Sequence, residues 1–455
     1  MENSLEKKIT FLSLIKYTLP TVVMMVFFSL YTIIDGMFIS RFVGSNALSS
    51  TNIVYPVINV LIGIGVMFAT GGSAIVANLM GKRNDKEAKE SFTLITISAL
   101  VFGIIVAVLC IIFIKEIIYA LGSTDILYDD CYSFLLTMLV FTPFIVLKVY
   151  FDYFLVTAGV PTLGLFSSVL GGIINIILDY VFIVPLNMGV AGAALATCIG
   201  YSLPSFIGIF YFLRKSNTLH FVKTKFDFNL IKNTCTNGCS EMVTQLSSSV
   251  TTFLYNITMI KFLGEDGVAS ITIILYVQFL LNSAYLGFTS GASPRISYNY
   301  GSKNKKELEK LIKYSYLSIL IFALITFLSS RGMSTTLISL FTDKNSNLFD
   351  ITLNGFMIFS FGFLVSGVNI FTSGMFTAFS NGKISALLSL LRTFAFFIVG
   401  IGVLPKIIGI NGVWLVVPFA EFTTLIFSII YLYKYKQNYM YENVFKLKYA
   451  LEKSR

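Results

Sequence analysis

Long apolar runs recur along the whole chain, and short polar segments separate them. Two examples are the run at 92–114 and the longer run at 181–213, which holds a short turn and therefore predicts a pair of helices. A helix needs about twenty apolar residues to cross the hydrocarbon core of a bilayer. The short alternating segments of a membrane barrel do not occur in the sequence. The pattern predicts an all-α integral membrane protein with twelve transmembrane helices.

The composition agrees with this prediction. The 455 residues are 56% hydrophobic and only 12% charged. A soluble globular domain carries about twice that charged fraction. We therefore expect the lipid bilayer to surround most of the chain.

The distribution of basic residues predicts the orientation of the helices. With twelve spans, one side of the membrane receives both termini and the even-numbered loops, and this side holds 23 of the 33 Lys and Arg residues. Its main clusters lie at 82–89, 214–232, 303–313 and 434–455. By the positive-inside rule this side is cytoplasmic. The net charge of +10 thus reflects membrane topology, and no nucleic-acid partner is expected.

The sequence repeats itself at an offset of 220 residues without gaps. RFVGSNAL from Arg41 matches KFLGEDGV from Lys261, and GKRNDKE from Gly81 matches GSKNKKE from Gly301. Positions 40–90 share 13 identities in 51 aligned residues with their counterparts. The chain is therefore predicted to be a duplication. We expect four segments: an N-terminal six-helix lobe (1–215), a cytoplasmic linker (216–237), a C-terminal six-helix lobe (238–436) and a cytoplasmic tail (437–455).

An even number of spans per half makes the two halves parallel repeats. They are then related by a pseudo-twofold axis along the membrane normal. Transporters built in this way bind their substrate between the repeats and expose it by rocking one against the other.

One group of polar residues is predicted to meet at a single depth in the N-terminal half. Asp35 lies late in the first helix and Asp179 late in the fifth, and both of these helices run outward. Asn175 is four residues before Asp179 and so shares its helix face, and Thr197 lies at a similar depth in the sixth helix. Such hard oxygen ligands suit a small cation, and two close carboxylates also favour a shared proton.

The alternative is that Asn175 and Thr197 only link helices, as polar residues in membrane bundles often do. That alternative does not explain two acids without a basic partner. The C-terminal counterparts at +220 are Tyr255, Ala395, Val399 and Val417, so the cluster occurs in one half only. This asymmetry favours a specialised ion site.

Other ionisable residues at membrane depth are expected to be paired or to serve a site. Asp152 is one turn after Lys148 and can pair with it. Arg392 and Glu421 are expected to form a buried ion pair. Glu241 is placed at the start of the seventh helix, where a carboxylate suits the helix dipole.

Enzymatic chemistry is not predicted. The sequence contains no G-x-x-x-x-G-K-[ST] loop and no H-E-x-x-H motif, and His220 is its single histidine. We expect no cofactor and no metal beyond a small cation at the Asp35 cluster.

The chain resembles the multidrug and toxic compound extrusion family of bacterial exporters. The resemblance covers nearly the whole chain, and NIILDYVFIVPLNMGVAGAALAT across the fifth and sixth helices is its most specific part. It implies two six-helix bundles with a V-shaped central cleft. It also implies a site for a coupling sodium ion or proton at Asp35, Asn175, Asp179 and Thr197.

The resemblance further implies antiport of lipophilic, often cationic, drugs or toxins across the bacterial cytoplasmic membrane, and we expect a monomer. Some relatives place a further cation site on an acid of the tenth helix, and the matching stretch FGFLVSGVNIFTSGMFTAFSNGK has no acid. The alternative function is a flippase for lipid-linked saccharides from the same superfamily. Such a flippase would need several basic side chains in its cleft.

Overall fold

The computed structural model describes residues 5–339 and 341–444, and the regular elements in this part of the chain are all helical. The first half contains α1 (Phe11–Phe38), the π-helix η1 (Ile39–Val43), α2 (Ser45–Gly81), α3 (Asp85–Ile112), α4 (Ile114–Ala120), α5 (Tyr128–Val140), α6 (Thr142–Thr157), α7 (Pro161–Ile183) and α8 (Gly189–Leu213). The apolar run at 92–114 is the body of α3.

The second half begins with an unusually long helix. It contains α9 (Phe228–Gly301), α10 (Lys305–Gly332), α11 (Ser334–Ser339), α12 (Asn347–Phe359), the 3-10 helix η2 (Ser360–Gly362), α13 (Phe363–Ala378), α14 (Gly382–Leu390), the π-helix η3 (Leu391–Ala395), α15 (Phe396–Ile408) and α16 (Ile410–Tyr435). Because α9 starts at Phe228, the last ten residues of the predicted 216–237 linker are helical. Residues 445–455 of the predicted tail (437–455) lie outside the described part of the chain.

The prediction of an all-helical membrane protein is confirmed. Among the described residues, ten helical segments are long and apolar enough to cross a membrane, and eleven if the bent pair α5–α6 is one span. At 1.5 Å per residue, the 74 residues of α9 would measure about 110 Å, several times the bilayer core. Gly264 breaks this helix with φ 63° and ψ −145°. The predicted number of twelve spans stays a prediction.

The backbone repeats where the sequence repeats. Gly189 and its counterpart Gly409 have φ values of 58° and 60°, in the left-handed region that glycine adopts without strain. Arg83 and its counterpart Lys303 turn the chain with φ values of 59° and 56°. The duplicated sequence therefore specifies the same turns twice.

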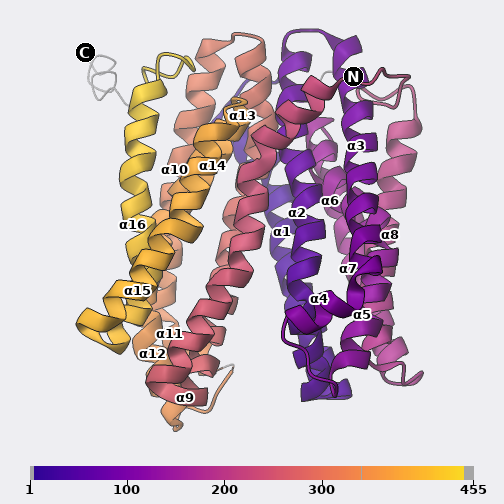
Figure 1. The fold of residues 1–455 in the computed structure, drawn as a ribbon. Helices are drawn as coiled ribbons and strands as arrows, with labels where there is room; N and C mark the ends of the chain where they lie inside the picture. The colour runs from indigo at the N-terminus through magenta and orange to yellow at the C-terminus, as the bar shows by residue number, and fades with distance from the viewer. Residues whose placement is uncertain (1–4, 340, 445–455) are drawn as a thin grey trace, which may run out of the picture.

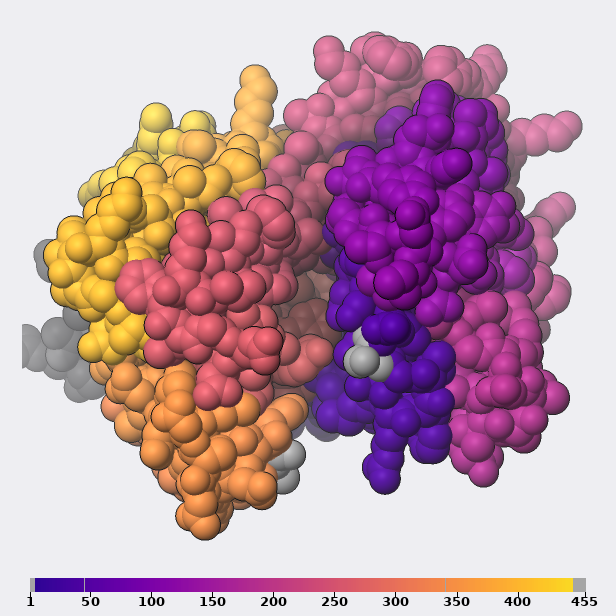
Figure 2. Space-filling view, turned by 60° about the horizontal axis from the view of Figure 1, so that its bottom comes forward, coloured from indigo at the N-terminus to yellow at the C-terminus, as the bar shows by residue number. Residues whose placement is uncertain are grey.

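The helices form two groups with a hollow between them. Figure 1 shows α1 to α8 on one side and α9 to α16 on the other. Figure 2, which brings the lower end of that view forward, shows a depression between the two groups. The opposite end is closed around the ends of the described chain, where Tyr298 donates to Glu6 at 2.5 Å and Asn443 donates to Glu309 at 2.9 Å. The hollow therefore opens away from the end that holds these contacts.

Glycines bring the two groups together at the closed end. A Cβ added to Gly71 on α2 would lie 2.1 Å from the carbonyl oxygen of Thr234, and one added to Gly238 on α9 would lie 1.9 Å from that of Met67. These distances leave no room for a side chain. Gly71 and Gly238, together with Gly81, Gly291 and Gly301, are called the glycine seam below.

The seam contacts follow the 220-residue repeat. A Cβ on Gly81 would lie 2.1 Å from the oxygen of Tyr298, and a Cβ on Gly301 would lie 2.2 Å from the oxygen of Asn78. Gly301 and Tyr298 are the +220 counterparts of Gly81 and Asn78. Each half therefore offers the same glycine face to the other.

We expect Gly238→Ala to destabilise the protein, because its methyl group would overlap the backbone of the opposite half. Overpacking of this kind costs about 1–3 kcal/mol. The melting temperature of the purified protein in detergent should fall. The matched control is Gly402→Ala on α15, where nothing lies within 4 Å of the added atom. Equal melting temperatures for the two variants would show that the seam does not hold the halves together.

Candidate ion and cargo sites

The four predicted ion-site residues come from three helices that pack together. Asp35 lies on α1, Asn175 and Asp179 lie on α7, and Thr197 lies on α8. Asn175 Nδ2 donates to Thr197 Oγ1 at 3.4 Å. The carboxyl groups of Asp35 and Asp179 lie within hydrogen-bonding reach of each other. The structure therefore brings these four residues together.

Several oxygens in this group are buried without a donor. Asn175 and Asp179 are 1% and 0% exposed. Within the described part of the chain, Asp35 Oδ1, Asn175 Oδ1 and both carboxyl oxygens of Asp179 have no hydrogen-bond partner. Burying an unpaired carboxylate costs several kcal/mol. Two adjacent carboxyl groups in this setting require a proton or a cation between them.

Glycines on α7 and α8 allow this convergence. A Cβ on Gly171 would lie 2.4 Å from the oxygen of Gly200, and a Cβ on Gly200 would lie 2.9 Å from Cβ of Asn175. The next residue, Gly172, faces α1. A Cβ added to it would lie 2.8 Å from the ring of Tyr31. Close packing of α7 against both partners thus sets the distances between the polar groups.

Aromatic residues around Asp35 were missed by the sequence analysis. Asp35 and Thr197 open onto a small cavity of about 30 Å³, lined in addition by Tyr31, Tyr55 and Tyr201. Tyr31 is four residues before Asp35 and Tyr201 is four residues after Thr197, so the helical period was a usable signal.

The C-terminal half has no such group at the equivalent positions. Tyr255, the counterpart of Asp35, is fully buried, and its ring packs edge-on against Phe397 with centroids 5.1 Å apart. An aromatic side chain occupies the place that the carboxyl group has in the first half.

Two of the other predicted charges form pairs. Lys148 Nζ lies 2.8 Å from Asp152 Oδ2, and Ser168 donates to the other oxygen of Asp152 at 2.8 Å. Arg392 Nη1 lies 3.6 Å from Glu421 Oε1. The sequence predicted both pairings.

Asn369 contacts the acid of the Arg392–Glu421 pair, and the sequence analysis did not predict this contact. Its Nδ2 donates to Glu421 Oε2 at 2.8 Å, and its Oδ1 accepts from Ser428 at 2.9 Å. Asn369 lies on α13, in the stretch where some relatives are expected to carry an acid. Here an acid from α16 reaches that stretch instead.

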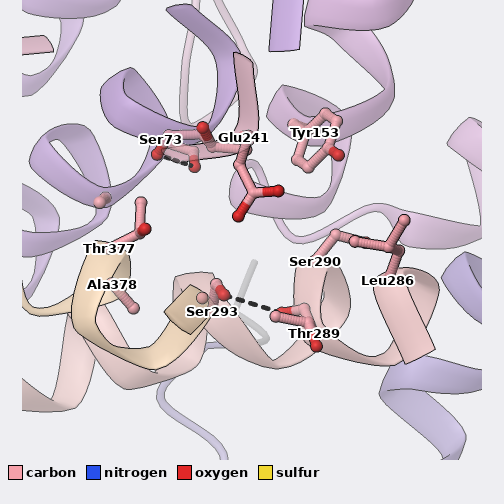
Figure 3. A pocket seen from close by; sticks show the side chains of 12 residues that line it. Ser73, Tyr153, Glu241, Leu286, Thr289, Ser290, Ser293, Thr377 and Ala378 are labelled. Atoms are coloured by element: carbon pink, nitrogen blue, oxygen red, sulfur yellow. Dashed lines mark hydrogen bonds between the residues drawn. The ribbon is translucent and has the colours of Figure 1, made fainter. Parts of the chain in front are cut away.

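Glu241 was placed wrongly at a helix start. The helix begins at Phe228, so Glu241 is more than three turns inside α9 and gains nothing from the helix dipole, which acts within the first turn. Figure 3 shows its carboxylate pointing into a pocket, opposite Ser293 and Thr289 and beside Tyr153.

This pocket, the candidate cargo pocket, lies between the two halves. Its cavity volume is about 30 Å³, well below the about 300–1,000 Å³ of small-molecule sites, so in this conformation it is a narrow recess. Glu241 is the charged member of its lining, which otherwise offers hydroxyl groups and small apolar side chains. Gly71 and Gly238 of the glycine seam neighbour the lining residues Thr70 and Glu241 along the chain. The lining from the first half is Thr70, Ser73, Ala74 and Tyr153, and that from the second half is Glu241, Leu286, Thr289, Ser290, Ser293, Gly374, Thr377 and Ala378.

Comparison with known proteins identifies relatives of similar length. A multidrug export protein MepA of Staphylococcus saprophyticus is 23% identical over 419 residues, which cover 90% of this chain and 89% of the relative. The MepA of Staphylococcus haemolyticus is 25% identical and covers 80% of this chain and 82% of the relative.

Solved structures share the fold. A MATE crystal structure in complex with MaL6 superposes with a TM-score of 0.88 at 20% identity, covering 95% of this chain and 97% of its own. A second structure is the outward-facing conformation of a multidrug resistance MATE family transporter of the MOP superfamily. Its TM-score is 0.88 at 21% identity, covering 95% of this chain and 97% of its own.

The family model described as MatE matches twice, at residues 20–181 and at residues 242–401. The two matches together cover more than half of the chain, and their starts and ends are offset by 222 and 220 residues, as the internal repeat requires. The chain therefore belongs to the MatE family of membrane transporters.

Proposed function

We propose that this protein is a multidrug exporter that exchanges lipophilic, often cationic, small molecules for sodium ions or protons. The observation that carries the proposal is the pocket between the halves, with Glu241 as its charged lining residue. Its relatives named multidrug export proteins support this function.

The pocket suits an organic cation better than a phosphate-bearing lipid. The half-buried carboxylate of Glu241 attracts a positive charge more strongly than a fully solvated one, because less water screens it. Hydroxyl groups of Thr289, Ser290 and Ser293 offer further acceptors. The ring of Tyr153 can stack on a planar cation.

The coupling ion is proposed to bind at Asp35 and Asp179. Their buried and unpartnered oxygens need a positive charge, which either sodium or a proton supplies. α1 also borders the closed end, since a Cβ on Gly291 would lie 2.4 Å from the hydroxyl oxygen of Thr21. One helix therefore carries an ion ligand and a contact that must open when the halves rock. Such rocking would expose the pocket to each side in turn.

The lipid-linked saccharide flippase is the weaker alternative. Basic side chains at membrane depth are engaged by other partners: Lys148 pairs with Asp152, Arg392 pairs with Glu421, and Arg295 stacks on the ring of Tyr17 at 4.0 Å. Arg392 is also within electrostatic reach of Glu241. A diphosphate would meet an acid in the pocket instead of these cations.

We further propose a monomer in the bacterial cytoplasmic membrane with both termini in the cytoplasm and no bound cofactor. In this orientation the hollow of Figure 2 faces outside, and the glycine seam closes the cytoplasmic side.

Cells that express the protein should expel ethidium, and Asp35→Asn should abolish this efflux because one cation ligand is lost. Efflux is measured by fluorescence while sodium and pH are varied independently. The ion on which efflux depends identifies the coupling ion.

The control for this experiment is Asp343→Asn, which changes an exposed acid in a loop. It should transport like the unchanged protein. If the folded, membrane-inserted protein moves no organic cation, the exporter proposal fails and the flippase becomes the leading hypothesis.

Glu241→Gln should weaken ethidium binding about tenfold, which corresponds to a loss of about 1.4 kcal/mol from one charge contact. Binding of an uncharged fluorescent compound of similar size should not change. Ser293→Ala serves as the control, because it alters the same pocket without removing charge. Equal loss for charged and uncharged compounds would contradict the role of Glu241 as a cation anchor.

A further inference from the structure

We propose that the Lys148–Asp152 pair, with Tyr31 and Tyr201 on one side and Tyr153 on the other, is a positioning chain that links the ion site to the cargo pocket. The inference rests on the proposed function, because it explains how an ion bound in one half changes the affinity for cargo held between the halves. We call these five residues the coupling chain.

The first link joins the ion site to the tyrosines. Tyr31 and Tyr201 line the same cavity as Asp35, and their hydroxyl groups interact with each other. Tyr201 lies within the electrostatic reach of Asp35, and Tyr31 lies within that of Asp152. A change of charge at Asp35 therefore acts directly on this pair of hydroxyl groups.

The second link joins the tyrosines to the ion pair on α6. Lys148 Nζ lies 5.5 Å from the ring centroid of Tyr201 and 4.6 Å from that of Phe28 on α1. It is also 2.8 Å from Asp152, and both charged residues are only 4% exposed. The ammonium group is thus held between α1, α8 and its own helix.

The third link joins the ion pair to the cargo pocket. Tyr153 follows Asp152 directly, and successive helical residues point about 100° apart, so α6 can face the ion pair with one and the pocket with the other. Tyr153 lines the pocket together with Glu241. Its hydroxyl group lies within the electrostatic reach of both Asp152 and Glu241.

Stability alone does not account for the buried pair. Replacing a buried ion pair by apolar residues of similar volume is often neutral or stabilising, because desolvation offsets the attraction. Burial in a medium of low polarity also makes the pair sensitive to any new charge nearby. A proton or sodium ion at Asp35 and Asp179 would reduce the attraction on Lys148, and the pair would shift relative to Tyr153 and Glu241.

The test measures coupling between the two ligands instead of transport. Ethidium affinity of the purified full-length protein is determined by fluorescence at low and high concentration of the coupling ion, with sodium and pH varied separately. The ratio of the two dissociation constants is the coupling factor, and typical values are about 5- to 150-fold. Any change in intrinsic ethidium affinity cancels in this ratio.

Tyr153→Phe and Tyr31→Phe should each lower the coupling factor to below about twofold, if the unchanged protein lies in that typical range. Each variant removes one hydroxyl group and keeps the ring, so folding should be preserved. The matched control is Tyr255→Phe, a fully buried tyrosine of the second half outside the coupling chain, which should retain the full factor.

Two failures can be told apart. If the unchanged protein shows ion-dependent ethidium affinity and both tyrosine variants keep it, the coupling chain is overturned while the exporter proposal stands. If the unchanged protein binds no ethidium or shows no ion dependence, the proposed function and the coupling chain both fail. A loss of coupling in Tyr255→Phe as well would also overturn the chain, because the effect would not be specific to it.

Discussion

A bilayer offers no hydrogen bonds to groups buried within it, and this constraint organises the molecule. Helices satisfy the backbone internally, so irregular backbone is confined to positions such as Gly264 that break one helix from the next. Charged side chains must find partners in the same way, and Lys148 with Asp152 and Arg392 with Glu421 do so. At membrane depth the described chain leaves Asp35, Asp179 and Glu241 without a direct ion pair, although Arg392 is within electrostatic reach of Glu241, and the proposed function rests on these three acids.

Glycine residues allow the two halves to pack backbone against backbone at one end of the molecule. At the end that holds the termini, backbone lies against backbone, and no side chain fits between α2 and α9. Toward the other end the groups diverge, and Figure 2 shows the hollow between them. The same device acts within the first half, where Gly171 and Gly200 bring α7 against α8 and set the position of Asn175. Close approach of helices thus creates both the closed end and the candidate ion site.

The candidate ion site and the candidate cargo pocket are separate, and α6 contributes side chains next to both. The site at Asp35 is enclosed in the first half, whereas the pocket at Glu241 needs side chains from both halves. Direct displacement of cargo by the ion is therefore not the only available route. The proposed coupling chain draws its side chains from α1, α6 and α8, with Lys148 of α6 lying 5.5 Å from the ring centroid of Tyr201.

The sequence by itself determined the membrane-spanning class, the duplication at 220 residues and the Lys148–Asp152 pair, because apolar length, internal identity and the helical period can be read directly from the chain. It also predicted the Arg392–Glu421 pair and the group around Asp35, because the position of a residue within its predicted helix gives its depth in the membrane. It placed Glu241 wrongly, since the start of a helix in a continuous polar-to-apolar stretch is not fixed by local pattern. It also could not show that Tyr153 shares a pocket with Glu241, that Asn369 meets Glu421, or which glycines lie in the seam. These contacts join segments more than fifty residues apart, and only the packing of whole helices decides them.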